Sequence, residues 1–285
     1  MSAPDTNAPL WPPLASRPRT IAFTSGKGGV GKSSLVLNTG LALARRGQRV
    51  AVLDGDLGLA SLNVLLGLSP RFDLRHVVSG ERRLTQVLLR GPHGLCVIPA
   101  GSGVAELANL DELARRRILD QLDEVARGVD YLLIDTGAGI NETVLSLVLA
   151  ADEAIVVTRP EPTALADAYA LMKVVIRRET SYPFHLLINM VRDAGEARRI
   201  HDGLGQILLR FLAYRPGYAG HVPVDPEVAR SVTEQVPFVV KSPRSPAALA
   251  IQALAGELLG ARAGTRARTG ATFWERVVRW GGQPV

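Results

Sequence analysis

The sequence predicts an α/β fold, in which a mostly parallel β-sheet carries helices on both faces and a short amphipathic helix follows at the C-terminus. Three observations predict it. From residue 20 onward, apolar β-type runs alternate with amphipathic helical segments, which is the pattern of βαβ units. Of the 285 residues, 47% are hydrophobic and only 5% aromatic, a mix that suits strands buried on both faces. A glycine-rich turn joins the first strand to the first helix.

The expected elements follow one another without an internal repeat. The repeated order of strand, loop and helix places the carboxyl ends of the strands on one edge, where ligands bind in open α/β sheets. The expected strands are 20–24, 49–53, 94–98, 130–134, 153–157 and 184–189, and the expected helices are 33–46, 104–127, 141–150, 161–178, 194–213 and 246–259.

Composition divides the chain into four parts. Residues 1–19 are rich in proline and polar residues and are expected to form a disordered leader. Residues 20–260 are expected to form one domain. Residues 261–271 are small and basic and are expected to be a flexible linker. Residues 272–285 are the tail.

Charge and cysteine content narrow the functional classes. A net charge of +6 and a pI of about 9.9 favour anionic partners, either nucleic acid or a phospholipid surface. The single cysteine, Cys96, lies in an apolar run, which excludes a disulfide framework and points to a core position. The five histidines lack metal-ligand spacing. No run is apolar and long enough to span a bilayer, and we find no signal peptide.

The glycine-rich turn fits the phosphate-loop pattern. Glycines let the backbone fold around an anion, and the helix that follows adds the positive end of its dipole. In this pattern Lys32 reaches the β- and γ-phosphates of a nucleotide and the Ser33 hydroxyl ligates Mg²⁺. The alternative is an ordinary glycine-rich turn. The predicted nucleotide-binding loop consists of Gly26, Lys27, Gly28, Gly29, Val30, Gly31, Lys32, Ser33 and Ser34.

A second lysine, Lys27, directly after the first glycine, makes the loop resemble that of the deviant Walker A ATPases, the MinD/ParA family. Their loop reads Lys-Gly-Gly-x-Gly-Lys-[Ser/Thr]. The resemblance implies a MinD-like P-loop fold, ATP and Mg²⁺ as ligands, ATP hydrolysis, and a homodimer in the presence of ATP. It also implies that Lys27 reaches across the dimer interface to the partner's nucleotide. The alternative is a solvated loop lysine.

Acidic residues follow two of the expected strands. Asp135 ends an apolar run, a Walker B arrangement that places it in the Mg²⁺ shell. The family resemblance places Asp54 in the outer shell of the metal and gives Asp56 the role of positioning the attacking water. It also lets Gly139 offer an N–H group to the γ-phosphate. The alternatives are an acidic helix cap for the two aspartates and an ordinary turn for the glycine.

The same resemblance implies a base pocket. An asparagine at the end of the strand 184–189 reads the adenine edge in the family, which assigns that role to Asn189. Pro223 and Asp225 would then pack near the ring. The guanine-reading Asn-Lys-x-Asp signature is absent from this strand end, which favours ATP over GTP. The alternative for Asn189 is a turn residue.

The tail predicts an amphipathic helix over residues 272–280 with arginines opposite its apolar side, which is typical of an interfacial membrane anchor. The alternative is a helix docked on its own domain, and one chain could use both arrangements. The expected membrane-facing residues are Phe273, Trp274, Val277, Val278 and Trp280.

Within the MinD/ParA family, the sequence most resembles the flagellar-number regulators FlhG/FleN. The resemblance implies a switch ATPase that regulates flagellar number, placement and gene expression on the inner face of the cell membrane. Its partner would be a flagellar transcription factor or the GTPase FlhF, without direct contact to nucleic acid. The alternatives are a ParA-type DNA-partitioning ATPase, a MinD-type division-site ATPase and a non-catalytic nucleotide-gated scaffold.

Overall fold

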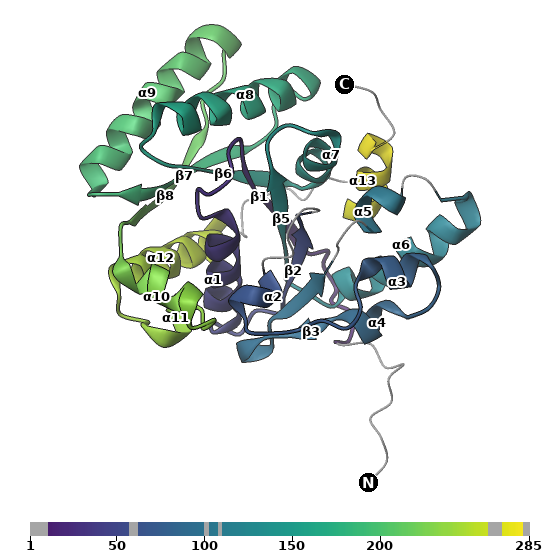
Figure 1. Cartoon of the computed structure of the whole chain (residues 1–285). Helices are drawn as coiled ribbons and strands as arrows, with labels where there is room; N and C mark the ends of the chain where they lie inside the picture. The colour runs from purple at the N-terminus through teal and green to yellow at the C-terminus, as the bar shows by residue number, and fades with distance from the viewer. Residues whose placement is uncertain (1–10, 57–61, 100–102, 108–109, 262–269, 282–285) are drawn as a thin grey trace.

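A computed structural model describes residues 11–56, 62–99, 103–107, 110–261 and 270–281, and its centre is one eight-stranded sheet (Figure 1). The strand order is β3-β4-β2-β5-β1-β6-β7-β8. Every neighbouring pair is parallel except β3 and β4, which are antiparallel. The strands are β1 (Arg19–Ser25), β2 (Val50–Gly55), β3 (Leu89–Arg90), β4 (Cys96–Pro99), β5 (Tyr131–Ala138), β6 (Glu153–Thr158), β7 (Phe184–Val191) and β8 (Gly217–Pro223).

Helices cover both faces of the sheet, because successive strand side chains point to opposite sides. One buried cluster contains Ile21 and Phe23 and packs under α1, α11 and α12; the other contains Ala22 and packs under α6, α7, α8, α9 and α13. The helices are α1 (Lys32–Ala44), α2 (Leu62–Leu65), α3 (Leu74–Val78), α4 (Leu84–Val87), η1 (Pro92–Gly94), α5 (Gly103–Leu107), α6 (Glu112–Arg127), α7 (Glu142–Ala150), α8 (Pro162–Arg178), α9 (Ala194–Leu212), α10 (Pro226–Thr233), α11 (Phe238–Lys241), α12 (Pro246–Ala261) and α13 (Phe273–Gly281).

The predicted fold class is confirmed, and all six expected strands are present within two or three residues of their expected ends, apart from β5, which extends to Ala138. The expected helix 104–127 is instead two helices, since Asp111 caps a new helix by accepting a hydrogen bond from the Ala114 N–H. The sequence pattern missed β8, an edge strand whose glycines and half-exposed residues give a weak apolar signal. None of the described helices has the length and apolar content of a membrane span.

Part of the expected disordered leader is ordered. Trp11 packs on the core, the Leu14 N–H donates to the Arg127 carbonyl (2.8 Å), and β1 begins at Arg19. Residues 1–10, most of the expected linker (262–269) and the chain end (282–285) lie outside the described residues.

Candidate functional site

The phosphate loop lies between β1 and α1, at the carboxyl edge of the sheet. Two of its glycines are required by close approach. A Cβ on Gly26 would lie 2.2 Å from the backbone of Asp167 in α8, and one on Gly31 would lie 2.5 Å from the amide nitrogen of Asn189. Gly31 also has φ 88°, a left-handed conformation, and no side chain caps the first turn of α1. The N–H groups of that turn are therefore available to an anion.

Lys32, the predicted phosphate-binding lysine, forms a buried ion pair with Asp135, which lies within β5. The Ser33 hydroxyl lies close enough to Asp135 to lower the pKa of that carboxyl, against the larger rise that burial causes. The structure thus brings together the phosphate loop and the Walker B carboxylate that the sequence predicted separately. Asp135 thus neutralises the charge of Lys32, a role that the phosphates of a bound nucleotide would take over.

Three carboxylates lie close together beside the phosphate loop, and neighbouring cations and hydrogen-bond donors compensate only part of their negative charge. Asp54 is 2% exposed and Asp135 fully buried. One oxygen of each, Oδ1 of Asp54 and Oδ2 of Asp135, has no hydrogen-bond partner among the described residues. Burial and the neighbouring Asp135 raise the pKa of Asp54 to about 7. Asp56 lies close enough to both carboxylates to add to their repulsion.

This donor set fits Mg²⁺. Magnesium takes oxygen ligands and is usually held by one or two carboxylates together with substrate phosphates and water. Ser33, Asp54 and Asp135 supply such oxygens, and the two partnerless oxygens mark where a cation would be favourable. Among the described residues, no group of three or more His, Cys, Asp or Glu side chains is placed to hold a metal ion by itself.

Lys27 does not point into free solvent but is held by its own chain. Its Nζ donates to Thr163 Oγ1 (2.8 Å) and lies 3.3 Å from Glu161 Oε2. Arg159 forms an ion pair with the same carboxylate and donates to the Gly29 carbonyl (3.4 Å). Sequence reasoning placed residue 161 at a helix start but missed this contact with the phosphate loop. The sequence signal that could have indicated this contact is the pair of charged residues on either side of Pro160, Arg159 and Glu161.

The second glycine-rich loop, after β5, is closed against β1. Gly139 has φ 97°, which a glycine adopts without strain, and its N–H donates to the Ser25 carbonyl (2.9 Å). The N–H expected to face a γ-phosphate is therefore used within the protein. The acidic loop that leaves β2 continues after Asp56 into residues 57–61, and these lie outside the described part of the chain.

The expected base-pocket residues fall into two groups. Asn189 lies beside the phosphate loop, where its amide nitrogen donates to the Val30 carbonyl (2.8 Å) and its oxygen accepts from the Met190 N–H. Asp225 is different: its two oxygens accept from the backbone N–H groups of Glu227 and Ala247, which fixes the starts of α10 and α12. The geometry supports a structural role for Asp225. Pro223 ends β8, paired with β7.

The tail residues lie away from this site, on α7 and α6. Figure 1 shows α13, in yellow, beside α7. Three of the five expected membrane-facing residues are buried against the domain, with Trp274 at 0% exposure. Val278 and Trp280 are half-buried. The helix is therefore docked, as the alternative prediction stated.

Comparisons with known proteins cover most of the chain. The ParA family, described as NUBPL iron-transfer P-loop NTPase, matches residues 17–259. The antiactivator FleN of Pseudomonas aeruginosa is 40% identical, over 83% of this chain and 85% of its own length. The chain belongs to the ParA/MinD family. The flagellum site-determining protein YlxH of Helicobacter pylori is 38% identical, over 66% of this chain and 63% of its own length.

Solved ParA/MinD structures agree with this membership. The septum site-determining protein MinD of Pyrococcus horikoshii, complexed with Mg-ADP, superposes with a TM-score of 0.68 at 25% identity, covering 88% of this chain and 99% of that one. As a ParA/MinD protein with a complete phosphate loop, the chain is an ATPase. Nucleotide and Mg²⁺ binding are properties of the family.

Proposed function

We propose that this protein is an ATP-driven dimerising switch that regulates flagellar number or placement and flagellar gene expression. The observation that carries the proposal is the 40% identity to FleN over most of both chains. YlxH, which is named as a flagellum site-determining protein, supports the same class of function. The intact pair Lys27 and Lys32 supports an active ATPase rather than a passive scaffold.

The side chains of the site suggest how binding leads to hydrolysis. Arriving phosphates accept hydrogen bonds from the free N–H groups of α1 and from Lys32, which leaves Asp135. Ser33, Asp54 and Asp135 would hold Mg²⁺, which would neutralise charge on the phosphates. Asp56 orients the attacking water. Lys27 leaves Glu161 and Thr163 and contacts the phosphates bound by the partner subunit.

The biochemical test is size-exclusion chromatography of the wild type with ATP, the wild type with ADP, and Asp56→Ala with ATP. A dimer that persists only for Asp56→Ala with ATP supports a switch that hydrolysis resets. A wild-type chain that stays monomeric with a slowly hydrolysed ATP analogue contradicts it. In the native host, Asp56→Ala should change the number of flagella per cell.

We further propose that α13 is a releasable membrane anchor, so that the ATP-bound dimer binds the inner face of the cell membrane. The docked helix carries an unfavourable feature, because the buried Trp274 indole N–H has no hydrogen-bond partner among the described residues. Such a group costs about 1–3 kcal/mol, which weakens docking without preventing it. Two anchors in one dimer would raise membrane avidity by ~10²–10⁴.

The proposed protein partner is a flagellar regulator. FleN is named an antiactivator, which favours a transcription activator as the partner, with the GTPase FlhF as the other candidate. Co-purification of either protein with the Asp56→Ala dimer, and not with the ADP form, would identify the partner.

The likeness to MinD favours a second candidate, a division-site ATPase. The two functions separate in one experiment, because loss of a division-site regulator changes where cells divide, whereas loss of a flagellar regulator changes flagellar number at normal cell length.

A further inference from the structure

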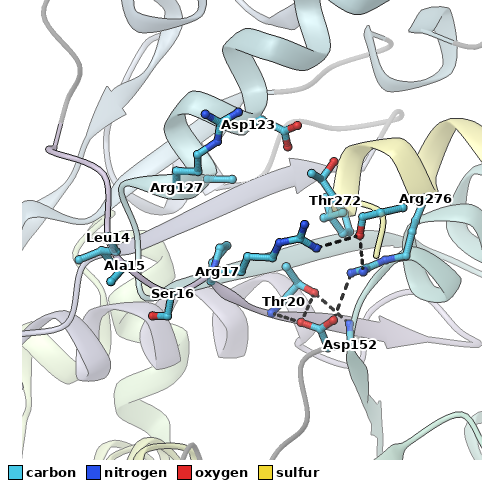
Figure 2. A pocket seen from close by; sticks show the side chains of 14 residues that line it. Leu14, Ala15, Ser16, Arg17, Thr20, Asp123, Arg127, Asp152, Thr272 and Arg276 are labelled. Atoms are coloured by element: carbon cyan, nitrogen blue, oxygen red, sulfur yellow. Dashed lines mark hydrogen bonds and ion pairs between the residues drawn. The ribbon is translucent and has the colours of Figure 1, made fainter. Parts of the chain in front are cut away.

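A cavity of about 400 Å³ lies at the edge of the sheet opposite the phosphate loop, where β1 starts and β6 is about to start (Figure 2). Its walls come from the leader, α6, the turn before β6 and the segment that enters α13. Its size is in the range of small-molecule sites. The nucleotide site described above uses none of its lining residues.

Three guanidinium groups line this cavity, those of Arg17, Arg127 and Arg276, with two carboxylates, Asp123 and Asp152. Asp152 is fully engaged: Oδ2 accepts from the N–H (2.9 Å) and hydroxyl (2.7 Å) of Thr20, and Oδ1 accepts from Arg276 (3.1 Å). Arg127 lies close enough to Asp123 to stabilise the charge of that carboxylate. Positive charge thus exceeds negative charge at the cavity wall.

Arg17 is the cation with the poorest compensation. Among the described residues its hydrogen bonds go to the backbone carbonyls of Gly270 (2.5 Å) and Ala271 (3.5 Å) and to no carboxylate. The Ala271 carbonyl also accepts from Arg276 (3.0 Å). Two guanidinium groups therefore converge on one uncharged oxygen, and Figure 2 shows both side chains directed at it. An anion at this point would accept from both groups and reduce their mutual repulsion.

We propose that this cavity is a binding site for a phosphate-bearing group, held by Arg17 and Arg276 with Arg127 at its margin. Guanidinium forks match the several oxygens of a phosphate better than a lysine ammonium would, and all three cations here are arginines. Because Arg17 and Arg276 both bind the residues that enter α13, the site joins anion recognition to the attachment of the tail.

The phosphate has two possible sources, a free phosphate compound or the headgroup of an acidic phospholipid. A lipid headgroup as the ligand depends on the proposed membrane role of α13. The existence of a phosphate-binding site does not depend on that role. The experiment therefore measures binding to the full chain in solution with Mg-ADP at saturating concentration, so that the phosphate loop is filled.

Isothermal calorimetry is carried out with inorganic phosphate and, separately, with glycerophosphoglycerol, the soluble headgroup of phosphatidylglycerol. The variant is Arg17→Gln, which alters an exposed leader residue, and the matched control is Arg116→Gln on α6, outside the cavity. The wild type and the control should bind equally, and Arg17→Gln should bind about tenfold more weakly, the loss expected for one charge-assisted hydrogen bond. Melting temperatures verify that both variants fold.

Binding of both probes supports the site with free phosphate as a source, and binding of the headgroup alone supports it with lipid as the source. The proposal is overturned if neither probe binds, if Arg17→Gln binds like the wild type, or if only phosphatidylglycerol vesicles bind, because the tail alone would account for that. A wild type that stays monomeric with ATP would contradict the proposed switch and leave these binding results unaffected.

Discussion

Lys27 of the phosphate loop and Glu161 at the start of α8 lie 3.3 Å apart, Nζ to Oε2, although 134 residues separate them in the chain. Arg159 shares the carboxylate, so Glu161 keeps one cationic partner when Lys27 moves. Both side chains of the pair are more than a third exposed, at 36% and 41%. Solvent screens such a pair, and the lysine is held weakly enough to leave it for a stronger anion.

Lys27→Ala should lower ATP hydrolysis by about a thousandfold, because a cation supplied across an interface stabilises the transition-state charge. ATP affinity of the monomer should change only a few-fold, since Lys32 and the α1 N-terminus remain. Steady-state hydrolysis and ATP binding by calorimetry measure the two quantities. Equal losses in both would show that Lys27 serves its own subunit's nucleotide.

Glu161→Gln should allow dimerisation at a few-fold lower ATP concentration, because the neutral amide no longer competes with phosphate for Lys27. Analytical ultracentrifugation over an ATP titration gives the midpoint. Glu142→Gln is a suitable control, since that glutamate at the start of α7 pairs with Arg178 at the end of α8 and not with the loop. A midpoint unchanged by Glu161→Gln would mean that the ion pair does not restrain Lys27.

Without nucleotide and metal, the protein should lose stability as pH rises from about 4 to 7. The pKa of Asp54 is raised from 3.8 to about 7 in the folded state. In that window the unfolded chain releases the proton and the folded chain keeps it, so rising pH favours unfolding. The contribution is up to about 4 kcal/mol, one pKa unit being about 1.4 kcal/mol.

Urea unfolding at several pH values in the presence of a chelator tests this pH dependence. Asp54→Asn should flatten the decline, because the amide does not titrate. If wild type and Asp54→Asn lose stability in parallel between about pH 4 and pH 7, another group is responsible.

Asp152→Asn should increase vesicle binding of the nucleotide-free protein. The Asp152–Arg276 ion pair is nearly buried, with side chains 6% and 12% exposed, and it fixes the start of α13. Breaking such a pair costs about 3 kcal/mol, which favours release of the helix. Sedimentation with acidic phospholipid vesicles measures the effect. The substitution leaves the sequence of the tail itself unchanged. Deleting residues 272–285 from the same variant should abolish the gain; a gain that persists would assign membrane binding to another surface.

The phosphate loop was predictable because its requirements are local. Close approach at Gly26 and the left-handed backbone at Gly31 restrict these positions to glycine, and a lysine directly follows each of them. The strands were predictable because burial on both faces requires continuous apolar runs. Asp54 and Asp135 could be placed together because parallel strands end at the same edge, and β2 and β5 are indeed neighbours.

The contacts that hold the site at rest were not predictable in this way. The partners of Lys27, the use of the Gly139 N–H by Ser25 and the capping role of Asp225 depend on which loops the sheet order places side by side. The amphipathic pattern of the tail was also compatible with two surfaces, because an apolar helix face is buried equally well by lipid or by α7.

By itself, the sequence determined the α/β fold, the phosphate loop and the acidic strand ends, since each depends on residues adjacent in the chain or on one periodic pattern. Only the tertiary structure decided that Lys27 is held by Glu161, that Lys32 pairs with Asp135, and that α13 lies against α7 beside an arginine-lined cavity. These are pairings between segments more than a hundred residues apart, and their energies exist only once the sheet has brought those segments together.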